Sequence, residues 1–277
     1  MKKIILMSLF CLSLLVNCST DTQENYMSLF VITEDLELGE NRVVLTTLDS
    51  NGNTITKDLK FYYKKLEGEK KQEIINKAIS NWPPNRKVFI TKIDFDEIGY
   101  WEIIVESEKE KAKATINIKE KSKTLSIGES VEPLFTPSLS NYNISDITTD
   151  VNPNRNLYQY SLDKALLEQK PIFITFSTPG LCVTGTCSPQ LEELKKISTN
   201  YNEVIIIHVE IWKNFKEVMQ KGDLSLGILN ESVKTFGIET EPWTFLINQD
   251  GIVKNRYQGF VEYKELEKDL QFIIGNQ

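Results

Sequence analysis

Two cysteines five positions apart, Cys182 and Cys187, are the residues of this sequence best suited to do chemistry. A disulfide needs Cα atoms roughly 4.4–6.8 Å apart, a separation that the intervening four-residue loop, which contains Gly185, can reach. Ser188 and Pro189 then predict the start of a helix, with serine as the N-cap and proline at the first helical position. The unpaired N–H groups and the positive end of that helix are expected to lower a thiol pKa and to favour thiolate.

The elements around this pair must hold the two sulfurs at one edge of a sheet. Residues 171–177 form a near-continuous apolar run directly before the cysteine loop, and residues 204–211 form a second. Such runs predict strands buried on both faces, and the helices between them predict a central mixed sheet flanked by helices. The other predicted elements are a helix capped by Ser161, a helix from Ser188 with Leu191, Leu194 and Ile197 on one side, a short helix over 230–236 ended by Gly237, a hairpin of 242–247 and 252–257 across Asp250-Gly251, and a last helix with Tyr263, Leu266, Leu270 and Ile273 on one stripe.

This order of elements resembles the thioredoxin fold, over roughly residues 126–277. The local matches are Thr178-Pro179-Gly180-Leu181-Cys182 after the apolar strand, Glu241-Pro242-Trp243-Thr244 opening a strand, and Tyr257-Gln258-Gly259 before the final helix. The segment Ile127-Gly128-Glu129-Ser130-Val131-Glu132-Pro133 is similar to the lead-in of many redoxin domains.

The resemblance implies roles for three residues. Pro242 is expected in the cis form facing the cysteines, Cys182 is expected to attack, and Cys187 to resolve. Thioredoxins have two residues between their cysteines, whereas this chain has four. Because Cys187 lies nearer the predicted helix start, the sequence leaves open which cysteine is the nucleophile.

Three functions compete for this pair. The first is thiol–disulfide exchange with protein thiols and disulfides. Another is a non-catalytic binding module with a structural disulfide. The last is metal binding as in Sco-type copper chaperones, with Cys182, Cys187 and His208 as ligands. The histidine of that family lies further along the chain, and a lone histidine inside an apolar strand is more often a core residue. A peroxiredoxin is disfavoured because Thr178 stands four rather than three positions before Cys182 and no arginine is near.

Two acidic residues are possible auxiliaries, and the sequence predicts no cofactor. Glu210, two positions after His208, could accept a proton near the cysteines, although a solvated strand end is the favoured interpretation. Glu241 directly precedes Pro242 and is expected to turn its backbone toward the cysteines, where it could pair with an extended substrate segment. An acidic side chain there would disfavour thiolate.

Residues 28–120 show strand-like segments separated by turn signals, which predicts an all-β immunoglobulin-like sandwich with Trp101 in its core. Alternation of apolar and polar residues over 112–119 indicates a half-buried strand. Residues 69–82 are ambiguous and could hold a short helix. The segment has no cysteine or histidine, so it is expected to do no chemistry and to serve as a spacer or docking module. Residues 121–277 are assigned to the thioredoxin-like domain with its linker and lead-in.

The first residues predict export. Lys2 and Lys3 precede a 13-residue apolar stretch, 4–16, which is too short to span a bilayer and suits a signal peptide. The stretch ends in Leu15-Val16-Asn17-Cys18, which resembles the lipobox of bacterial lipoproteins, although Asn17 departs from the usual small residue. Residues 1–17 are thus a predicted signal peptide and 18–27 a tether with Cys18 acylated, which anchors the protein to the membrane on its extracytoplasmic side.

The cysteine count and the charge agree with this organisation. Cleavage removes Cys11 and lipidation uses Cys18, which leaves two thiols in a compartment where disulfides persist. The formal net charge of -7 becomes -9 after loss of Lys2 and Lys3. No cluster of basic residues could hold a phosphate backbone, so nucleic acid is excluded as a partner.

Overall fold

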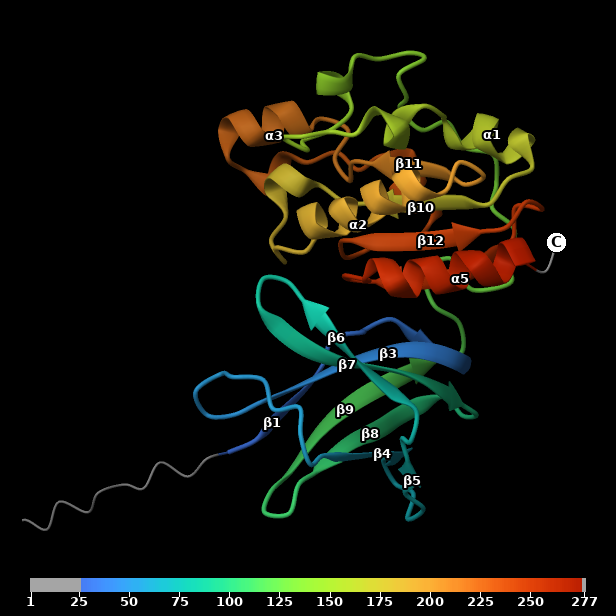
Figure 1. Ribbon diagram of the computed structural model, residues 1–277. Helices are drawn as coiled ribbons and strands as arrows, with labels where there is room; N and C mark the ends of the chain where they lie inside the picture. The colour runs from blue at the N-terminus through green and yellow to red at the C-terminus, as the bar shows by residue number, and fades with distance from the viewer. Residues whose placement is uncertain (1–25, 276–277) are drawn as a thin grey trace, which may run out of the picture.

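The computed structural model describes residues 26–275, which form two packed parts (Figure 1). The predicted signal peptide, the lipidation site Cys18 and most of the tether lie outside the described residues. The N-terminal part runs from residue 28 to residue 119 and consists of strands only. The C-terminal part combines a sheet with helices. Between residues 26 and 275, no helix combines the length and the apolar character that a membrane crossing requires.

Two sheets make up the N-terminal part. Neighbouring strands in both sheets pair antiparallel, except that β2 runs parallel to β9. The strand order of the first sheet is β1 (Ser28–Val31), β3 (Gly39–Leu48), β7 (Arg86–Phe95) and β6 (Lys77–Trp82). Across the second sheet they are β2 (Leu36–Glu37), β9 (Lys111–Lys119), β8 (Gly99–Glu106), β4 (Lys60–Lys65) and β5 (Gln72–Glu73).

The two sheets share one apolar core. Phe61 of β4 and Phe89 of β7 come from different sheets, and their ring centroids lie 4.7 Å apart. Trp101 is buried in the same core, as predicted, and its indole N–H donates to the Glu97 carbonyl at 3.0 Å. The prediction that residues 69–82 could hold a short helix is wrong. β6 instead pairs antiparallel with β7 along its whole length, and this cross-strand pairing outweighs a sparse local apolar pattern.

The C-terminal part is built on a mixed sheet. Its strands are β11 (Ile205–Val209), β10 (Ile172–Phe176), β12 (Trp243–Ile247) and β13 (Val253–Gln258), in that order. β10 runs parallel to β11, and the other neighbours are antiparallel. All residues of β10, β11 and β12 are buried. The sequence prediction of strands buried on both faces is therefore confirmed.

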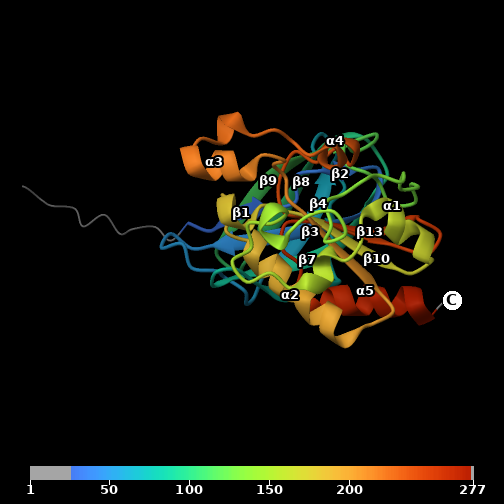
Figure 2. The same ribbon diagram turned by 90° about the horizontal axis from the view of Figure 1, so that it is seen from above.

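Helices cover both faces of this sheet. α2 (Cys187–Asn200) and α5 (Tyr263–Gly275) pack their leucines on one face, and α1 (Leu162–Ala165) and α4 (Glu231–Thr235) lie on the other (Figure 2). A further helix, α3 (Phe215–Lys221), precedes α4. Single 3-10 turns occur at Ile144–Asp146, Arg155–Tyr158, Leu166–Glu168, Pro179–Leu181 and Leu224–Leu226.

One helix start and one capping hydrogen bond differ from prediction, and one helix was not predicted. α2 begins at Cys187 rather than after Ser188, with Thr186 in the N-cap position. Ser161 precedes α1, but its hydroxyl accepts the N–H of Thr136 at 2.9 Å instead of capping the helix. α3 lies in a stretch for which the sequence predicted no element.

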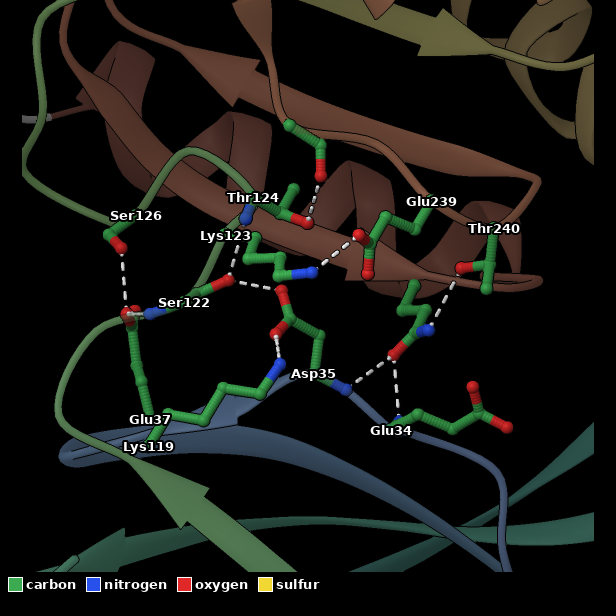
Figure 3. Close-up of polar contacts among 12 residues, drawn as sticks. Glu34, Asp35, Glu37, Lys119, Ser122, Lys123, Thr124, Ser126, Glu239 and Thr240 are labelled. Carbon is green, nitrogen blue, oxygen red and sulfur yellow. Dashed lines mark hydrogen bonds and ion pairs between the residues drawn. The ribbon is translucent and has the colours of Figure 1, made fainter. Parts of the chain in front are cut away.

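Polar contacts join the two parts. The guanidinium of Arg256, on β13, lies 3.2 Å from Glu37 and 3.6 Å from Asp35 of the N-terminal part. Figure 3 shows the neighbouring contacts, in which Lys119 pairs with Asp35, and the Ser122 N–H and the Ser126 hydroxyl both donate to Glu37. Further contacts between the parts include the Arg42–Glu265 ion pair, two backbone N–H groups that donate to the Gln258 side chain, and the edge-to-face packing of Trp82 on Phe260.

Candidate functional site

The two cysteines form a disulfide where β10 ends and α2 begins. Their Cα atoms lie 6.1 Å apart, so the four-residue loop does reach the separation expected from the sequence. Cys187 is fully buried at the first position of α2, whereas Cys182 is partly exposed in the loop before it. Gly185 has φ +70°, which gives the loop the left-handed residue that it needs to turn back toward α2.

Hydrogen bonds converge on the sulfur of Cys182. The backbone N–H of Cys187 donates to Cys182 Sγ at 3.3 Å, and the hydroxyl of Thr184 lies 3.2 Å from the same sulfur. Because Cys187 opens α2, these contacts place the sulfur at the positive end of the helix. Thr184 also contacts the Thr186 hydroxyl at 2.8 Å. Thr184 was not among the site residues predicted from the sequence, although its place between the two cysteines was the available signal.

Pro242 follows a cis peptide bond after Glu241, at the start of β12. The Glu241 carbonyl accepts a long hydrogen bond of 3.4 Å from the Thr184 hydroxyl, so its backbone does face the cysteine loop. Its side chain faces the loop as well, with Oε2 accepting the Thr178 N–H at 2.6 Å. Burial raises the pKa of Glu241 to about 7, against the lowering effect of the Thr178 hydrogen bonds. A carboxylate oxygen and both sulfurs lie within 4.8 Å of one another.

Glu210 is buried beneath the same loop, so the favoured interpretation of a solvated strand end is wrong. Its Oε1 accepts the N–H of Thr149 at 2.5 Å and the Thr149 hydroxyl at 2.9 Å. The hydroxyl of Thr149 in turn accepts the N–H of Gly180 at 2.8 Å, which links Glu210 to the loop before Cys182. Burial raises the pKa of Glu210 to about 7, while hydrogen bonds from the neighbouring threonines lower it.

His208 belongs to the core rather than to the cysteine pair. Its Nδ1 lies 2.8 Å from the hydroxyl of Tyr158, and its Nε2 lies 3.0 Å from the carbonyl of Ser177. Burial lowers the pKa of His208 to about 4, which keeps the ring neutral. Among residues 26–275, the group of possible metal ligands at this site consists of Cys182, Cys187 and Glu241. The structure does not bring His208 to the cysteines.

The strand order, the position of the cysteine loop between β10 and α2, and the cis-proline beside the disulfide agree with the resemblance seen in the sequence. The C-terminal part has a thioredoxin-like fold.

Comparisons with known proteins add distant structural likenesses. No family model matches the sequence, and no curated protein matches it. A crystal structure from Chlorobium tepidum, provisionally named a thiol:disulfide interchange protein DsbE, is 14% identical, with a TM-score of 0.39 over 55% of this chain and 100% of that one. StoA from Bacillus subtilis is 17% identical, with a TM-score of 0.28 over 36% and 82% of the two chains. The filamin domain of Lin-41 is 11% identical, with a TM-score of 0.25 over 34% and 93%.

Proposed function

We propose that the protein is a thiol–disulfide oxidoreductase that works through Cys182 and Cys187. The observation that carries this proposal is the difference in exposure between two bonded sulfurs at one helix start. Cys182 is partly exposed, whereas Cys187 is buried behind it. A partner can therefore approach Cys182, and the buried Cys187 is placed to attack the sulfur of Cys182.

The exchange proceeds in two balanced steps. In the reduced protein, the Cys182 thiolate attacks a partner disulfide, forms a mixed disulfide and releases one partner thiolate. The Cys187 thiolate then attacks Cys182 Sγ, closes the intramolecular disulfide and releases the second partner thiolate. Two electrons pass to the partner. The same steps in reverse oxidise a partner dithiol, and the carbonyl of Glu241 offers an extended partner segment a backbone acceptor beside the sulfurs.

Single serine substitutions test this proposal. Cys182→Ser and Cys187→Ser are both expected to abolish steady-state reduction of insulin or of a small model disulfide. Only Cys187→Ser should accumulate a mixed disulfide with the substrate, because it keeps the exposed nucleophile and loses the resolving thiol. Mass spectrometry after acid quenching reports this intermediate.

Two results would reject the proposal. One is a wild-type protein as inactive as both variants. The other is a reduction potential well below about −300 mV, the range of structural disulfides. Either result would favour a non-catalytic module with a structural bridge. A mixed disulfide trapped on Cys182→Ser would instead reverse the roles of the two cysteines.

We further propose that the protein is exported and anchored to the membrane through a lipid on Cys18, where it meets protein thiols and disulfides outside the cytoplasm. The charged start, the short apolar stretch and the lipobox-like tetrad support this proposal. The disulfide agrees with an oxidising compartment.

Fractionation of cells tests the anchor. Cys18→Ser is expected to move the protein from the membrane fraction to the soluble extracytoplasmic fraction, because the acylated side chain is lost. Cys11→Ser, which changes the predicted signal peptide only, serves as the matched control and should remain on the membrane. Retention of Cys18→Ser on the membrane would contradict the proposal.

The N-terminal sandwich is proposed to be immunoglobulin-like and to dock or position the redox domain without chemistry of its own. Residues 28–120 contain no cysteine or histidine, which supports a non-catalytic role. The buried ion pairs of Arg256 with Asp35 and Glu37 support a fixed position of one part against the other.

A further inference from the structure

The sulfurs of Cys182 and Cys187 share their surroundings with one carboxylate. An oxygen of Glu241 lies within 4.8 Å of both sulfurs, so the three groups can reach a common point. They come from two elements that the sheet holds together, the loop between β10 and α2 and the cis turn before β12. This juxtaposition needs no change in the fold, because β10 and β12 are hydrogen-bonded neighbours.

The Glu241 carboxylate has a hydrogen-bond donor but no cationic partner among residues 26–275. The N–H of Thr178 holds Oε2 at 2.6 Å, which fixes the direction of the carboxylate. Within residues 26–275, no lysine or arginine forms an ion pair with Glu241, although the carboxylate is partly buried. A buried carboxylate is stabilised by a cation, and metal coordination is one way to provide it.

The cysteine side of the site is likewise supported by donors. The Cys187 N–H and the Thr184 hydroxyl both contact Cys182 Sγ, and the start of α2 adds the positive end of a helix. Such contacts outside the ligand set stabilise thiolates and orient them toward a metal. The loop between the two cysteines lies at the surface, since Val183 is 83% exposed, and its Gly185 has φ +70°.

We propose that the reduced protein binds one Zn²⁺ through Cys182, Cys187 and Glu241. Two thiolates and one carboxylate form a donor set of mixed softness, which suits zinc, whereas calcium and magnesium prefer oxygen ligands alone. Copper(I) would be satisfied by the two thiolates and would not need Glu241. Three protein ligands leave the fourth tetrahedral position open to water or to a partner thiolate.

Zinc binding and disulfide exchange exclude each other at this site. Reduction of the disulfide by a dithiol or phosphine takes up two electrons and two protons and gives two thiols, and coordination of Zn²⁺ releases those two protons. Both sulfurs are then bound to the metal and cannot attack a disulfide. The metal site does not depend on the proposed exchange activity, because it requires only that the pair can be reduced.

Cobalt(II) is the probe that tests the site. The full chain carrying Cys11→Ser and Cys18→Ser, whose only thiols are Cys182 and Cys187, is reduced, freed of reductant and titrated with Co²⁺ without oxygen. One equivalent is expected to produce a thiolate-to-cobalt charge-transfer band and the visible bands of tetrahedral cobalt. Competition with Zn²⁺ should abolish both and give the zinc affinity. The oxidised protein is expected to produce neither band.

Variants of Glu241 decide whether the carboxylate is a ligand. Glu241→Gln is expected to weaken zinc binding roughly tenfold or more, and Glu241→Asp, whose shorter side chain cannot reach the same point, should weaken it as well. Glu239→Gln is the matched control, since Glu239 is exposed and paired with Lys123, and it should bind as the parent does. Unchanged affinity in a folded Glu241 variant, equal binding by the oxidised protein, or no binding by the reduced parent would each overturn the proposal.

Discussion

Replacement of Arg256 by alanine is expected to cost about 3 kcal/mol of folding free energy and to uncouple the two parts of the protein. The Arg256 side chain is only 8% exposed, and those of Asp35 and Glu37 are 12% and 14% exposed. Breaking a buried ion pair leaves a charge without compensation and typically costs about 3–5 kcal/mol. The low end applies because Lys119 still pairs with Asp35 at 2.9 Å.

The loss extends beyond one ion pair. Arg256 also donates to the carbonyl of Thr124 at 3.1 Å, in the segment that joins the two parts. Removal of the guanidinium therefore loosens the joint and the N-terminal contact together. Urea unfolding followed by tryptophan fluorescence and by circular dichroism is expected to give coincident curves for the wild type and separated curves for Arg256→Ala.

A second substitution at the same joint separates this effect from a general loss of surface charge. Lys123 pairs with Glu239, and both side chains are about two-thirds exposed. Exposed pairs contribute about 0–1 kcal/mol, so Lys123→Ala should leave the unfolding curves coincident. If Arg256→Ala behaves like Lys123→Ala, the buried pairs do not couple the two parts.

Glu210→Gln is expected to raise the free energy of unfolding relative to the wild type as pH increases. Above neutral pH, this difference between variant and wild type should be about 3 kcal/mol more favourable to the variant than it is at pH 4. Burial raises the pKa of Glu210 from 4.5 in an unfolded chain to about 7 in the fold. A raised carboxyl pKa means that folding favours the protonated form, so stability is lost as pH rises from about 4.5 to about 7. A shift of this size corresponds to about 3 kcal/mol, and a neutral glutamine removes the penalty while its Oε1 can still accept from Thr149.

The other ionisable groups around Glu210 do not produce the same difference. Burial lowers the pKa of His208 to about 4, so its contribution is lost as pH falls below about 6.5, and it is present in both proteins. Burial also raises the pKa of Tyr158, which stays neutral throughout. Asp150 and Lys195 face the same cluster as an ion pair of 2.8 Å. The wild-type minus variant difference therefore isolates Glu210.

Denaturant unfolding of the oxidised proteins from pH 4 to pH 8 measures this difference. Glu231→Gln is the control, because Glu231 is 79% exposed at the start of α4 and its replacement should give a nearly flat difference. A difference between wild type and Glu210→Gln that stays constant over this range would show that Glu210 has an ordinary pKa.

Local sequence was sufficient wherever spacing and periodicity carry the information. The apolar runs predicted β10 and β11, the Asp250-Gly251 turn predicted the β12–β13 hairpin, and the leucine stripe predicted α5. The two cysteines predicted the disulfide, because a short loop with a glycine can close it without help from distant segments. Alternation along residues 112–119 predicted β9 in the same way.

Tertiary structure alone decided the surroundings of that pair. Glu210 is buried because Thr149, 61 positions earlier in the chain, is packed over it, and no local pattern encodes that contact. Glu241 comes within 4.8 Å of the sulfurs because β12 pairs with β10. The contacts of Arg256 with Asp35 and Glu37 join positions more than 200 residues apart. Periodicity reports which side of an element faces a core, whereas the burial and pairing of a charged group depend on which distant segment covers it.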